Sequence, residues 1–259
     1  MTEKWALVTG ACVNTGAAIV EKFAKEGENV VFTGRNAERV AEAEKRYREK
    51  FPQVKIVGKV FCSLKEDLSA DEEGVERLFS ELDKEEITIT DVILNAADLG
   101  AGFSALESPL CDFVRVINTN VVWNFCIIRS AAERMIKTGG GSITFINSNT
   151  AYRAIPERAA YSASKSGQLG LMRALALDLG KYKIRVNAVL PGMIHTDRTD
   201  KNPEFYKNVP SAFSPLGGIA EGSDIADAAW YFAAHAKNTT GAELTVDCGN
   251  MIQLYPVKW

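Results

Sequence analysis

The sequence predicts an α/β fold, a doubly wound and mostly parallel sheet of about seven strands with helices on both faces. Short apolar runs alternate with longer amphipathic stretches along the 259 residues, which is the pattern of repeated strand–helix–strand units. Several apolar runs lack a two-residue alternation, as expected of strands that helices cover on both faces. No repeat or Pro/Ser-rich linker interrupts the chain, so we expect one domain over residues 1–259.

The expected strands and helices alternate from the first to the last. The candidate strands are Trp5–Thr9, Asn29–Thr33, Val54–Val60, Asp91–Leu94, Ser142–Asn147, Ile184–Val189 and Glu243–Val246. The candidate helices cover residues 15–27, 36–50, 71–84, 109–137, 158–181 and 221–235. Ligands of such folds bind beyond the carboxyl ends of the strands, so we expect the chemistry directly after each strand.

The composition excludes several classes of protein. Hydrophobic residues make up 46% and charged residues 24%, and the net charge of −3 does not favour nucleic acid or a membrane surface. The chain shows no membrane-spanning apolar stretch and no signal peptide. Five scattered cysteines without a C-x-x-C pair, and only two histidines, indicate free thiols and no metal site. We therefore expect a cytoplasmic protein.

The segment after the first strand has the composition of a phosphate-binding turn. It reads Thr9-Gly10-Ala-Cys-Val-Asn14-Thr15-Gly16. Small residues let the backbone approach a pyrophosphate, and the N-terminus of the next helix then faces it. Gly10, Asn14, Thr15 and Gly16 are therefore candidate cofactor residues. Asn14 stands at a position for a small residue, but asparagine tolerates a left-handed conformation better than most residues.

The end of the second strand bears on the choice of dinucleotide. Gly34-Arg35 stands where an acid would bind a ribose 2′-hydroxyl, and an arginine there pairs with a 2′-phosphate. The sequence thus favours NADP(H) over NAD(H), although Val13 occupies the place of a second basic residue, and a solvated surface arginine is the alternative. After the third strand, Asp67-Leu68 is a candidate adenine contact or simply an acidic helix start.

Tyr161 and Lys165 are the candidate acid/base pair. Residues four apart lie on one helix face, so the phenol and the ammonium can point into the same site. A phenol with a pKa near ~10 is a poor base at neutral pH, and a nearby positive charge lowers that pKa. The pair is suited to moving a proton on and off an alcohol oxygen. A Tyr-x-x-x-Lys pattern is also common on exposed helices, so the surrounding residues decide.

Those surroundings resemble the short-chain dehydrogenase/reductases of the compact, single-domain, Rossmann-like type from about Lys4 to Asn250. The markers are Thr9-Gly10…Gly16, Asp91-Val-Ile-Leu-Asn95-Ala-Ala, Asn120, Ser148, Tyr161-x-x-x-Lys165, Arg185-Val-Asn187-Ala-Val-Leu-Pro191-Gly192 and Gly241-Ala-Glu-Leu-Thr-Val-Asp247. Ser148 precedes Tyr161 by 13 residues and Asn120 precedes Ser148 by 28, as in the family pattern.

The resemblance implies hydride transfer between a nicotinamide and a carbon that carries an alcohol or ketone. It implies that Tyr161 moves the proton, while Lys165 lowers the tyrosine pKa and holds the nicotinamide ribose. Ser148 is expected to bind the substrate oxygen, and Asn120 to hold a water that links Lys165 to solvent. Further cofactor contacts implied by the family are Asn95, Ala96, Pro191, Gly192, the backbone of Ile194 and the Thr196 hydroxyl.

The chain departs from the family pattern at three positions. Asn14 and Asp98 each replace a glycine, and Cys248 interrupts an Asp-Gly-Gly. Asp98 is expected near the cofactor ribose, where it would alter the cofactor geometry or the charge of the pocket. Neither the Asp98 nor the Cys248 change touches the proton-transfer residues.

The substrate is expected to be a small-molecule alcohol or ketone held partly by a loop at about 193–215. That loop is unusually polar over residues 195–202, which favours a sugar, polyol or sugar acid. Arg153 and Arg198 are candidates to hold a carboxylate or phosphate, and His195 is expected to be a loop residue. The alternative for these charges is a solvated loop face. A 3-oxoacyl or hydroxysteroid reductase and a non-catalytic nucleotide sensor also stay open.

The family resemblance also implies a homo-oligomer, a tetramer or a dimer. Its members often bury between subunits the helices that here correspond to Val121–Ile136 and to the one starting at Tyr161; a packed core is the alternative. The tail 251–259 is apolar for a chain end, so we expect it to dock on the protein.

Overall fold

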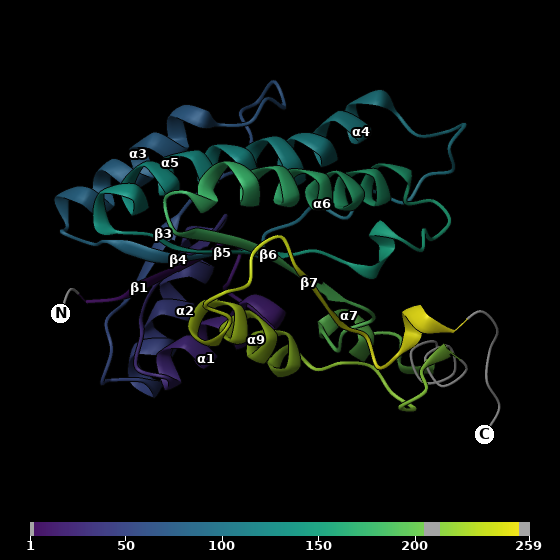
Figure 1. The fold of residues 1–259 in the computed structure, drawn as a ribbon. Coiled ribbons are helices and arrows are strands. Elements are labelled where there is room, and N and C mark those ends of the chain that lie inside the picture. Colours follow the sequence, from purple (N-terminus) through teal and green to yellow (C-terminus); the bar gives the residue numbers. More distant parts are fainter. Residues whose placement is uncertain (1–2, 205–212, 254–259) are drawn as a thin grey trace.

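A computed structural model describes residues 3–204 and 213–253, which form one sheet of seven strands with helices on both faces (Figure 1). The strands are β1 (Trp5–Val8), β2 (Asn29–Gly34), β3 (Ile56–Val60), β4 (Ile89–Leu94), β5 (Gly141–Ile146), β6 (Ile184–Pro191) and β7 (Glu243–Val246). Their order is β3-β2-β1-β4-β5-β6-β7, and every pairing is parallel. The predicted doubly wound α/β fold is confirmed.

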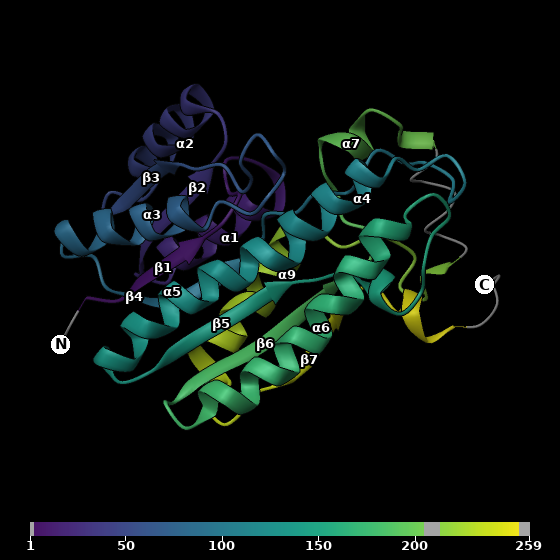
Figure 2. The ribbon, with the colours of Figure 1, turned by 90° about the horizontal axis from the view of Figure 1, so that it is seen from above.

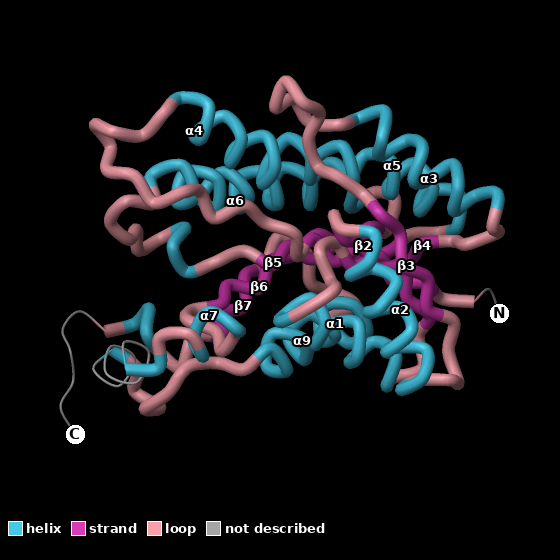
Figure 3. Tube along the Cα trace, turned by 180° about the vertical axis from the view of Figure 1, so that it is seen from behind, coloured by secondary structure: helices cyan, strands magenta, loops and turns pink. Residues whose placement is uncertain are grey.

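Helices cover the sheet in two layers (Figures 1 and 3). One layer contains α3 (Glu72–Lys84), α4 (Leu110–Ile117), α5 (Trp123–Thr138) and α6 (Ala159–Gly180). The other contains α1 (Asn14–Lys25), α2 (Ala37–Lys50) and α9 (Gly222–Trp230). Each layer buries its own apolar cluster against one face of the sheet. Burial on both faces explains why several strands read as continuous apolar runs.

The stretch 109–137, expected as one helix, contains a π-helical turn. Its parts are α4, the π-turn η1 (Asn118–Val122) and α5, and Figure 2 shows them as one continuous rod beside α6. A second π-turn, η3 (Tyr231–His235), follows α9. Single π-turns inside helices are rare, and those that occur are often found at functional sites. The remaining short elements are η2 (Asn149–Ala151), α7 (Asp197–Asp200) and η4 (Asn250–Ile252).

The strand order reverses between β1 and β4, and Asn95 fastens the two strands there. The backbone N–H groups of Asn95 and Ala96 both donate to the Thr9 hydroxyl at 3.0 Å. The Asn95 side-chain amide donates to the carbonyls of Thr9 and Gly10, also at 3.0 Å. Ligands of open α/β sheets bind at this kind of crossover. Asn95 therefore joins the ends of β1 and β4 directly beneath the expected site.

Two carboxyl groups are buried near the amino ends of the strands, away from that site. Glu28 precedes β2 and Asp91 lies on β4, and both are 6% exposed. Burial, together with the neighbouring Asp91 carboxyl, raises the pKa of Glu28 from 4.5 to about 8. Burial raises the pKa of Asp91 as well. The folded protein therefore holds a proton on this pair that the unfolded chain releases.

This raised pKa predicts a pH-dependent stability that Glu28→Gln removes. The Glu28 contribution is complete below pH 4.5 and is lost as the pH rises through about 8. We expect Glu28→Gln to raise the Tm by about 5 °C at pH 8.5 relative to wild type, and by less than about 1 °C at pH 4.5. Thermal denaturation measures both. Glu49→Gln on the exposed side of α2 is the control, and an equal gain from it would contradict the assignment to Glu28.

Candidate active site

The four predicted catalytic positions come together at the carboxyl edge of the sheet. Ser148 follows the end of β5, Tyr161 and Lys165 lie one turn apart on α6, and Asn120 lies in the π-turn between α4 and α5. Lys165 Nζ is 5.6 Å from the centre of the Tyr161 ring. The sheet and the two helices beside it thus place side chains from three distant parts of the sequence in one cluster.

The Lys165 ammonium is buried almost completely. Its side chain is 1% exposed, and burial lowers its pKa to about 7. Nζ donates to the carbonyl of Ile146 at 2.9 Å and to Gln168 Oε1 at 3.2 Å. An ammonium has three donors, so one N–H remains for a further acceptor in the site. The oxygens that stabilise the buried ammonium are neutral. Its positive charge is therefore not cancelled and can lower the pKa of a neighbouring phenol.

Ser148 is oriented by its own chain. It is 8% exposed, and its Oγ accepts hydrogen bonds from Thr150 N at 3.2 Å and Thr150 Oγ1 at 2.9 Å. Both bonds use Ser148 as the acceptor, so its hydroxyl hydrogen can donate to a substrate oxygen. Burial raises the pKa of the Tyr161 phenol, while the Ser148 hydroxyl and the Arg158 guanidinium act in the opposite direction.

Asn120 is fully buried, and its side chain hydrogen-bonds both backbone groups of Asp98 in the loop after β4. We call these contacts the Asn120 clasp. Asn120 Oδ1 accepts from the N–H of Asp98 at 2.7 Å, and its Nδ2 donates to the carbonyl of Asp98 at 2.8 Å and to Ser164 Oγ at 2.9 Å. Its backbone carbonyl accepts from Gln168 Nε2 at 2.6 Å and from Asn124 Nδ2 at 2.8 Å. The two lone pairs of that carbonyl are thus used by protein amides.

Asp98 turns its carboxylate away from this clasp. Asp98 Oδ2 lies 2.8 Å from Arg115 Nη1, and its Oδ1 accepts from the N–H of Gly100 at 2.8 Å. The charge that the sequence placed near the cofactor ribose is therefore paired with a cation of α4. The substitution of glycine by aspartate in this loop is accommodated by a local ion pair.

The turn after β1 has the geometry of an anion cradle. Gly10 has a φ of +64°, and a Cβ there would lie 2.9 Å from Ala96 Cα. A Cβ on Gly16 would lie 2.6 Å from the Gly10 carbonyl oxygen. Asn14 has a φ of 53°, so it adopts the left-handed conformation expected of it. The N-cap residue Val13 has no side-chain acceptor for the first N–H groups of α1, which fit the pyrophosphate of a dinucleotide.

The end of β2 has no room for an acidic side chain. A Cβ on Gly34 would lie 2.4 Å from Cys12 Sγ and 2.7 Å from Val40 Cγ2. Arg46 donates to the Cys12 carbonyl at 2.9 Å, and Arg35 is exposed directly after Gly34. Burial raises the pKa of the Cys12 thiol, against the positive charges of Arg46 and Arg39. Basic groups therefore gather where an adenosine 2′-phosphate would lie.

A family profile described as "Enoyl-(Acyl carrier protein) reductase" matches residues 10–250. The chain belongs to the short-chain dehydrogenase/reductase superfamily. The name of the profile describes the family, whose members differ in substrate.

Three superfamily relatives are similar over nearly the whole chain. A 3alpha-hydroxysteroid dehydrogenase of Mediterraneibacter gnavus is 34% identical and covers 95% of this chain and 96% of its own. An L-rhamnose-1-dehydrogenase of Scheffersomyces stipitis is 32% identical, with 95% of each chain covered. The crystal structure of a putative gluconate dehydrogenase from Agrobacterium tumefaciens superposes with a TM-score of 0.89 at 29% identity, covering 97% of each chain. The Rossmann-like fold of the superfamily is thereby shown.

The segment after β6 lies against both α9 and the turn after β1 (residues 9–16), which we call the glycine turn. A Cβ on Gly192, just after Pro191 at the end of β6, would lie 2.6 Å from Asp247 Cβ. Ile194 forms an isolated parallel bridge with Ala220. Thr196 precedes α7, whose first N–H, that of Asp197, donates to Asn14 Oδ1 at 3.3 Å. The segment therefore reaches from the sheet to the turn after β1.

Asp67 and Leu68 form a surface turn. Asp67 Oδ1 accepts from the N–H of Ser69 at 2.9 Å and from its hydroxyl at 2.6 Å, and this hydroxyl is the main reason why the pKa of Asp67 is lowered. The carbonyl of Leu68 accepts from Asn118 Nδ2 at 2.8 Å. These are the contacts of a turn held against the start of the π-turn, and an adenine contact stays a prediction.

The candidate substrate residues differ in their contacts. Arg153 Nη1 donates to the carbonyls of Asn250 at 2.7 Å and Gln253 at 2.8 Å, so this arginine holds the segment that leads to the C-terminus. The side chain of Arg198 lies outside the described residues, as do residues 205–212 of the expected substrate loop and the tail from 254. His195 is exposed and bonds Asp200 at 2.7 Å, which is the main reason why its pKa is raised. It is a loop residue, as expected.

Asn147 and Gln168 are the polar residues of the site that sequence reasoning missed. Asn147 Oδ1 accepts from the N–H of Ser148 at 2.7 Å, and its Nδ2 donates to Gln168 Oε1 at 3.0 Å. The signal that indicates Gln168 is its spacing, because residues 161, 165 and 168 share one helix face. Asn147 carries no comparable signal, since any residue can end a strand.

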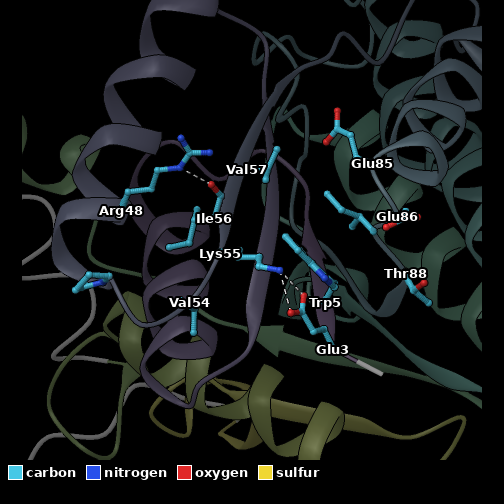
Figure 4. A pocket seen from close by; sticks show the side chains of 12 residues that line it. Glu3, Trp5, Arg48, Val54, Lys55, Ile56, Val57, Glu85, Glu86 and Thr88 are labelled. Atoms are coloured by element: carbon cyan, nitrogen blue, oxygen red, sulfur yellow. Dashed lines mark hydrogen bonds and ion pairs between the residues drawn. The ribbon is translucent and has the colours of Figure 1, made fainter. Parts of the chain in front are cut away.

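A surface hollow of about 890 Å³ lies at the opposite edge of the sheet (Figure 4). Its walls include Trp5 at the start of β1 and Ile56 at the start of β3. Beside it, Lys55 bonds Glu3 at 2.8 Å. Among the described residues no group of His, Cys, Asp or Glu could hold a metal ion, and none of the described helices has the length and apolarity to cross a membrane.

The Asn120 clasp predicts a specific stability difference. We expect Asn120→Ala to lower the free energy of unfolding by about 2–4 kcal/mol, because it removes the three hydrogen bonds of a fully buried side chain and takes this partner from the N–H and the carbonyl of Asp98. Asp98→Asn keeps the backbone bonds and weakens only a partly exposed ion pair, so it should cost about 1 kcal/mol or less. Urea denaturation of both variants measures the difference. Equal losses would mean that the Arg115 ion pair, and not the clasp, holds the loop.

Proposed function

We propose that this protein is an NADP(H)-preferring oxidoreductase that interconverts a secondary alcohol and a ketone, with Tyr161 as the acid/base. The observation that carries the proposal is the cluster of Tyr161, Lys165, Ser148 and Asn120 at the sheet edge, beside the glycine turn. Membership of the superfamily by itself supports an oxidoreductase. The cofactor, the reaction and the roles of the residues go beyond that membership and are our proposal.

A nicotinamide dinucleotide, when bound, supplies or accepts the hydride. Gly10, Asn14, Thr15 and Gly16 would hold its pyrophosphate at the N-terminus of α1. Asn95 and Ala96 would line its ribose side, and Pro191, Gly192, Ile194 and Thr196 its nicotinamide side. Asp67 and Leu68 are our candidates for the adenine. The free N–H of Lys165 would serve the nicotinamide ribose hydroxyls.

The protein manages the proton. In reduction Tyr161 donates its phenolic proton to the carbonyl oxygen, and in oxidation the phenolate removes the alcohol proton. Ser148 donates its free hydroxyl hydrogen to the same oxygen and stabilises the charge that develops there. Burial raises the phenol pKa, so a low pKa of Tyr161 is proposed for the protein with its dinucleotide bound, where a charged Lys165 favours the phenolate.

NADP(H) is favoured by the surroundings of Gly34. An acidic side chain would clash with Cys12 at that position, while Arg35, Arg39 and Arg46 supply positive charge on the same side. NAD(H) lacks the 2′-phosphate that these charges would bind, so it would bind more weakly. NAD(H) remains the alternative.

We propose a hydroxylated substrate such as a sugar, polyol or sugar acid. The L-rhamnose-1-dehydrogenase and the putative gluconate dehydrogenase support this class, and so does the polar segment 195–202. A hydroxysteroid is the second candidate, because the 34% identical relative is a 3alpha-hydroxysteroid dehydrogenase. Arg198 remains our candidate for an anionic substrate group, and Arg153 would first have to release the carbonyls that it holds.

We further propose a homo-oligomer in the cytoplasm. Apolar side chains are exposed along the α4–α5 rod, among them Leu110 at 76% and Phe125 at 40%. Leu177 on the neighbouring α6 is 85% exposed. Large apolar side chains exposed on adjacent helices support association into a dimer or tetramer. The five cysteines are free, which is consistent with a reducing compartment.

The cofactor proposal predicts the binding behaviour of Arg35→Ala. Fluorescence titration should show tighter binding of NADPH than of NADH to the wild-type protein. Arg35→Ala should weaken NADPH binding about tenfold or more, since it removes a charged partner of the 2′-phosphate, and should change NADH binding by less than about twofold. Lys45→Ala on the outer side of α2 is the matched control. Preference of the wild type for NADH would make Arg35 a surface residue and refute the NADP(H) assignment.

The catalytic proposal predicts that Tyr161→Phe lowers turnover without weakening NADPH binding. Sugars, polyols, sugar acids, hydroxysteroids and 3-oxoacyl thioesters are assayed with both dinucleotides in the direction each substrate allows. Tyr161→Phe should lower kcat/KM for any active substrate by about 10²–10⁴-fold, because the proton donor is gone, with NADPH affinity unchanged within about twofold. A variant that retains full turnover would exclude Tyr161 as the acid/base. NADPH binding without turnover of any substrate would favour a nucleotide sensor.

A further inference from the structure

Gln168 is a buried amide that contacts three parts of the catalytic cluster. It is 1% exposed. Its Nε2 donates to the Asn120 carbonyl at 2.6 Å, and its Oε1 accepts from Lys165 Nζ at 3.2 Å and from Asn147 Nδ2 at 3.0 Å. Asn147 in turn accepts from the N–H of Ser148. One side chain thus joins the π-turn, the ammonium and the end of β5.

The surroundings determine which way the Gln168 amide faces. Its oxygen meets two donors, an ammonium and an amide N–H, and its nitrogen meets a carbonyl. A flipped amide would set donor against donor on one side and acceptor against acceptor on the other. Since the acceptor end is fixed in this way, the Lys165 ammonium has a fixed acceptor as well. The second acceptor, the carbonyl of Ile146, belongs to β5 and is equally rigid.

The same amide occupies the Asn120 carbonyl. That carbonyl accepts from Gln168 and from Asn124, which uses both of its lone pairs. The connection between Lys165 and the π-turn is therefore made by a side chain of α6, three residues after the lysine. The water that the family resemblance implies at Asn120 stays a prediction.

We propose that Gln168 is a positioning residue of the reaction centre, which holds the Lys165 ammonium beside Tyr161 and links it to the Asn120 carbonyl. A role of Gln168 in a reaction rests on the proposed function, whereas the contacts of Gln168 do not. Gln168 touches neither substrate nor dinucleotide in this role, because it acts through Lys165.

A purely structural role would need only the volume of the side chain. Gln168→Met keeps an unbranched chain of similar length in the same space but has no amide. Gln168→Glu keeps the shape and the acceptor and replaces the neutral oxygen by a carboxylate. Met172→Ala, one helical turn after Gln168, removes a fully buried apolar side chain that takes part in none of these hydrogen bonds, and so controls for lost stability.

The test is the pKa of Lys165, measured by NMR in the full-length protein labelled with ε-¹³C-lysine, with the signal assigned by its loss in Lys165→Met. An acceptor stabilises the charged ammonium and an anion does so more strongly. We expect Gln168→Met to lower the pKa by about 1 unit relative to wild type, and Gln168→Glu to raise it by about 1 unit. Met172→Ala should leave it within about 0.3 units.

Two results would overturn the proposal. One is a Lys165 pKa in Gln168→Met that equals the wild-type value, and the other is a shift of the same size in Met172→Ala. If Gln168→Met does not fold, a Gln168→Glu protein whose Lys165 pKa is unchanged has the same consequence. This measurement needs no dinucleotide and no substrate, so its outcome is independent of the NADPH titration and the substrate screen that test the proposed function.

Discussion

The buried ammonium of Lys165 is the constraint on which the arrangement of the site depends. A charge taken out of water is costly unless strong acceptors replace its hydration. Here the acceptors are a carbonyl of β5 and the Gln168 amide, and the burial still lowers the lysine pKa to about 7. Every group that holds these acceptors, including the π-turn and Asn147, is therefore tied to the position of the lysine.

The crossover of the sheet supplies the rigid base for this network. β1 and β4 are neighbours in the sheet but are separated by two strands in the sequence. The loops that follow them are fastened to each other through Thr9 and Asn95, and the loop after β4 is fastened to the π-turn through Asn120. The glycine turn and the cluster of Tyr161 and Lys165 are consequently held in one frame, which the proposed transfer between a cofactor and a substrate would require.

The departures of this chain from the family pattern are absorbed locally. Asn14 adopts the left-handed conformation of the glycine that it replaces, and its side chain accepts from the segment after β6. Asp98 is neutralised by Arg115. Cys12 fills the space next to Gly34, so a larger side chain at that position would clash with it. Each change leaves the proton-transfer residues in place.

The sequence by itself determined the fold class, the left-handed turn at Asn14 and the face shared by Tyr161 and Lys165, because strand and helix periodicity and backbone preference are local properties. The helix expected over 109–137 is present, but the π-turn within it was not predicted, and Gln168 of the neighbouring α6 donates to the Asn120 carbonyl in that turn. Only the tertiary structure decided that Asp98 pairs with Arg115, that Arg153 holds the segment leading to the C-terminus, and that Gln168 joins Lys165 to Asn120. Apart from the bond between Gln168 and Lys165, these contacts link residues 17 to 100 positions apart. Their partners are set by how the elements pack, and no local pattern encodes that packing.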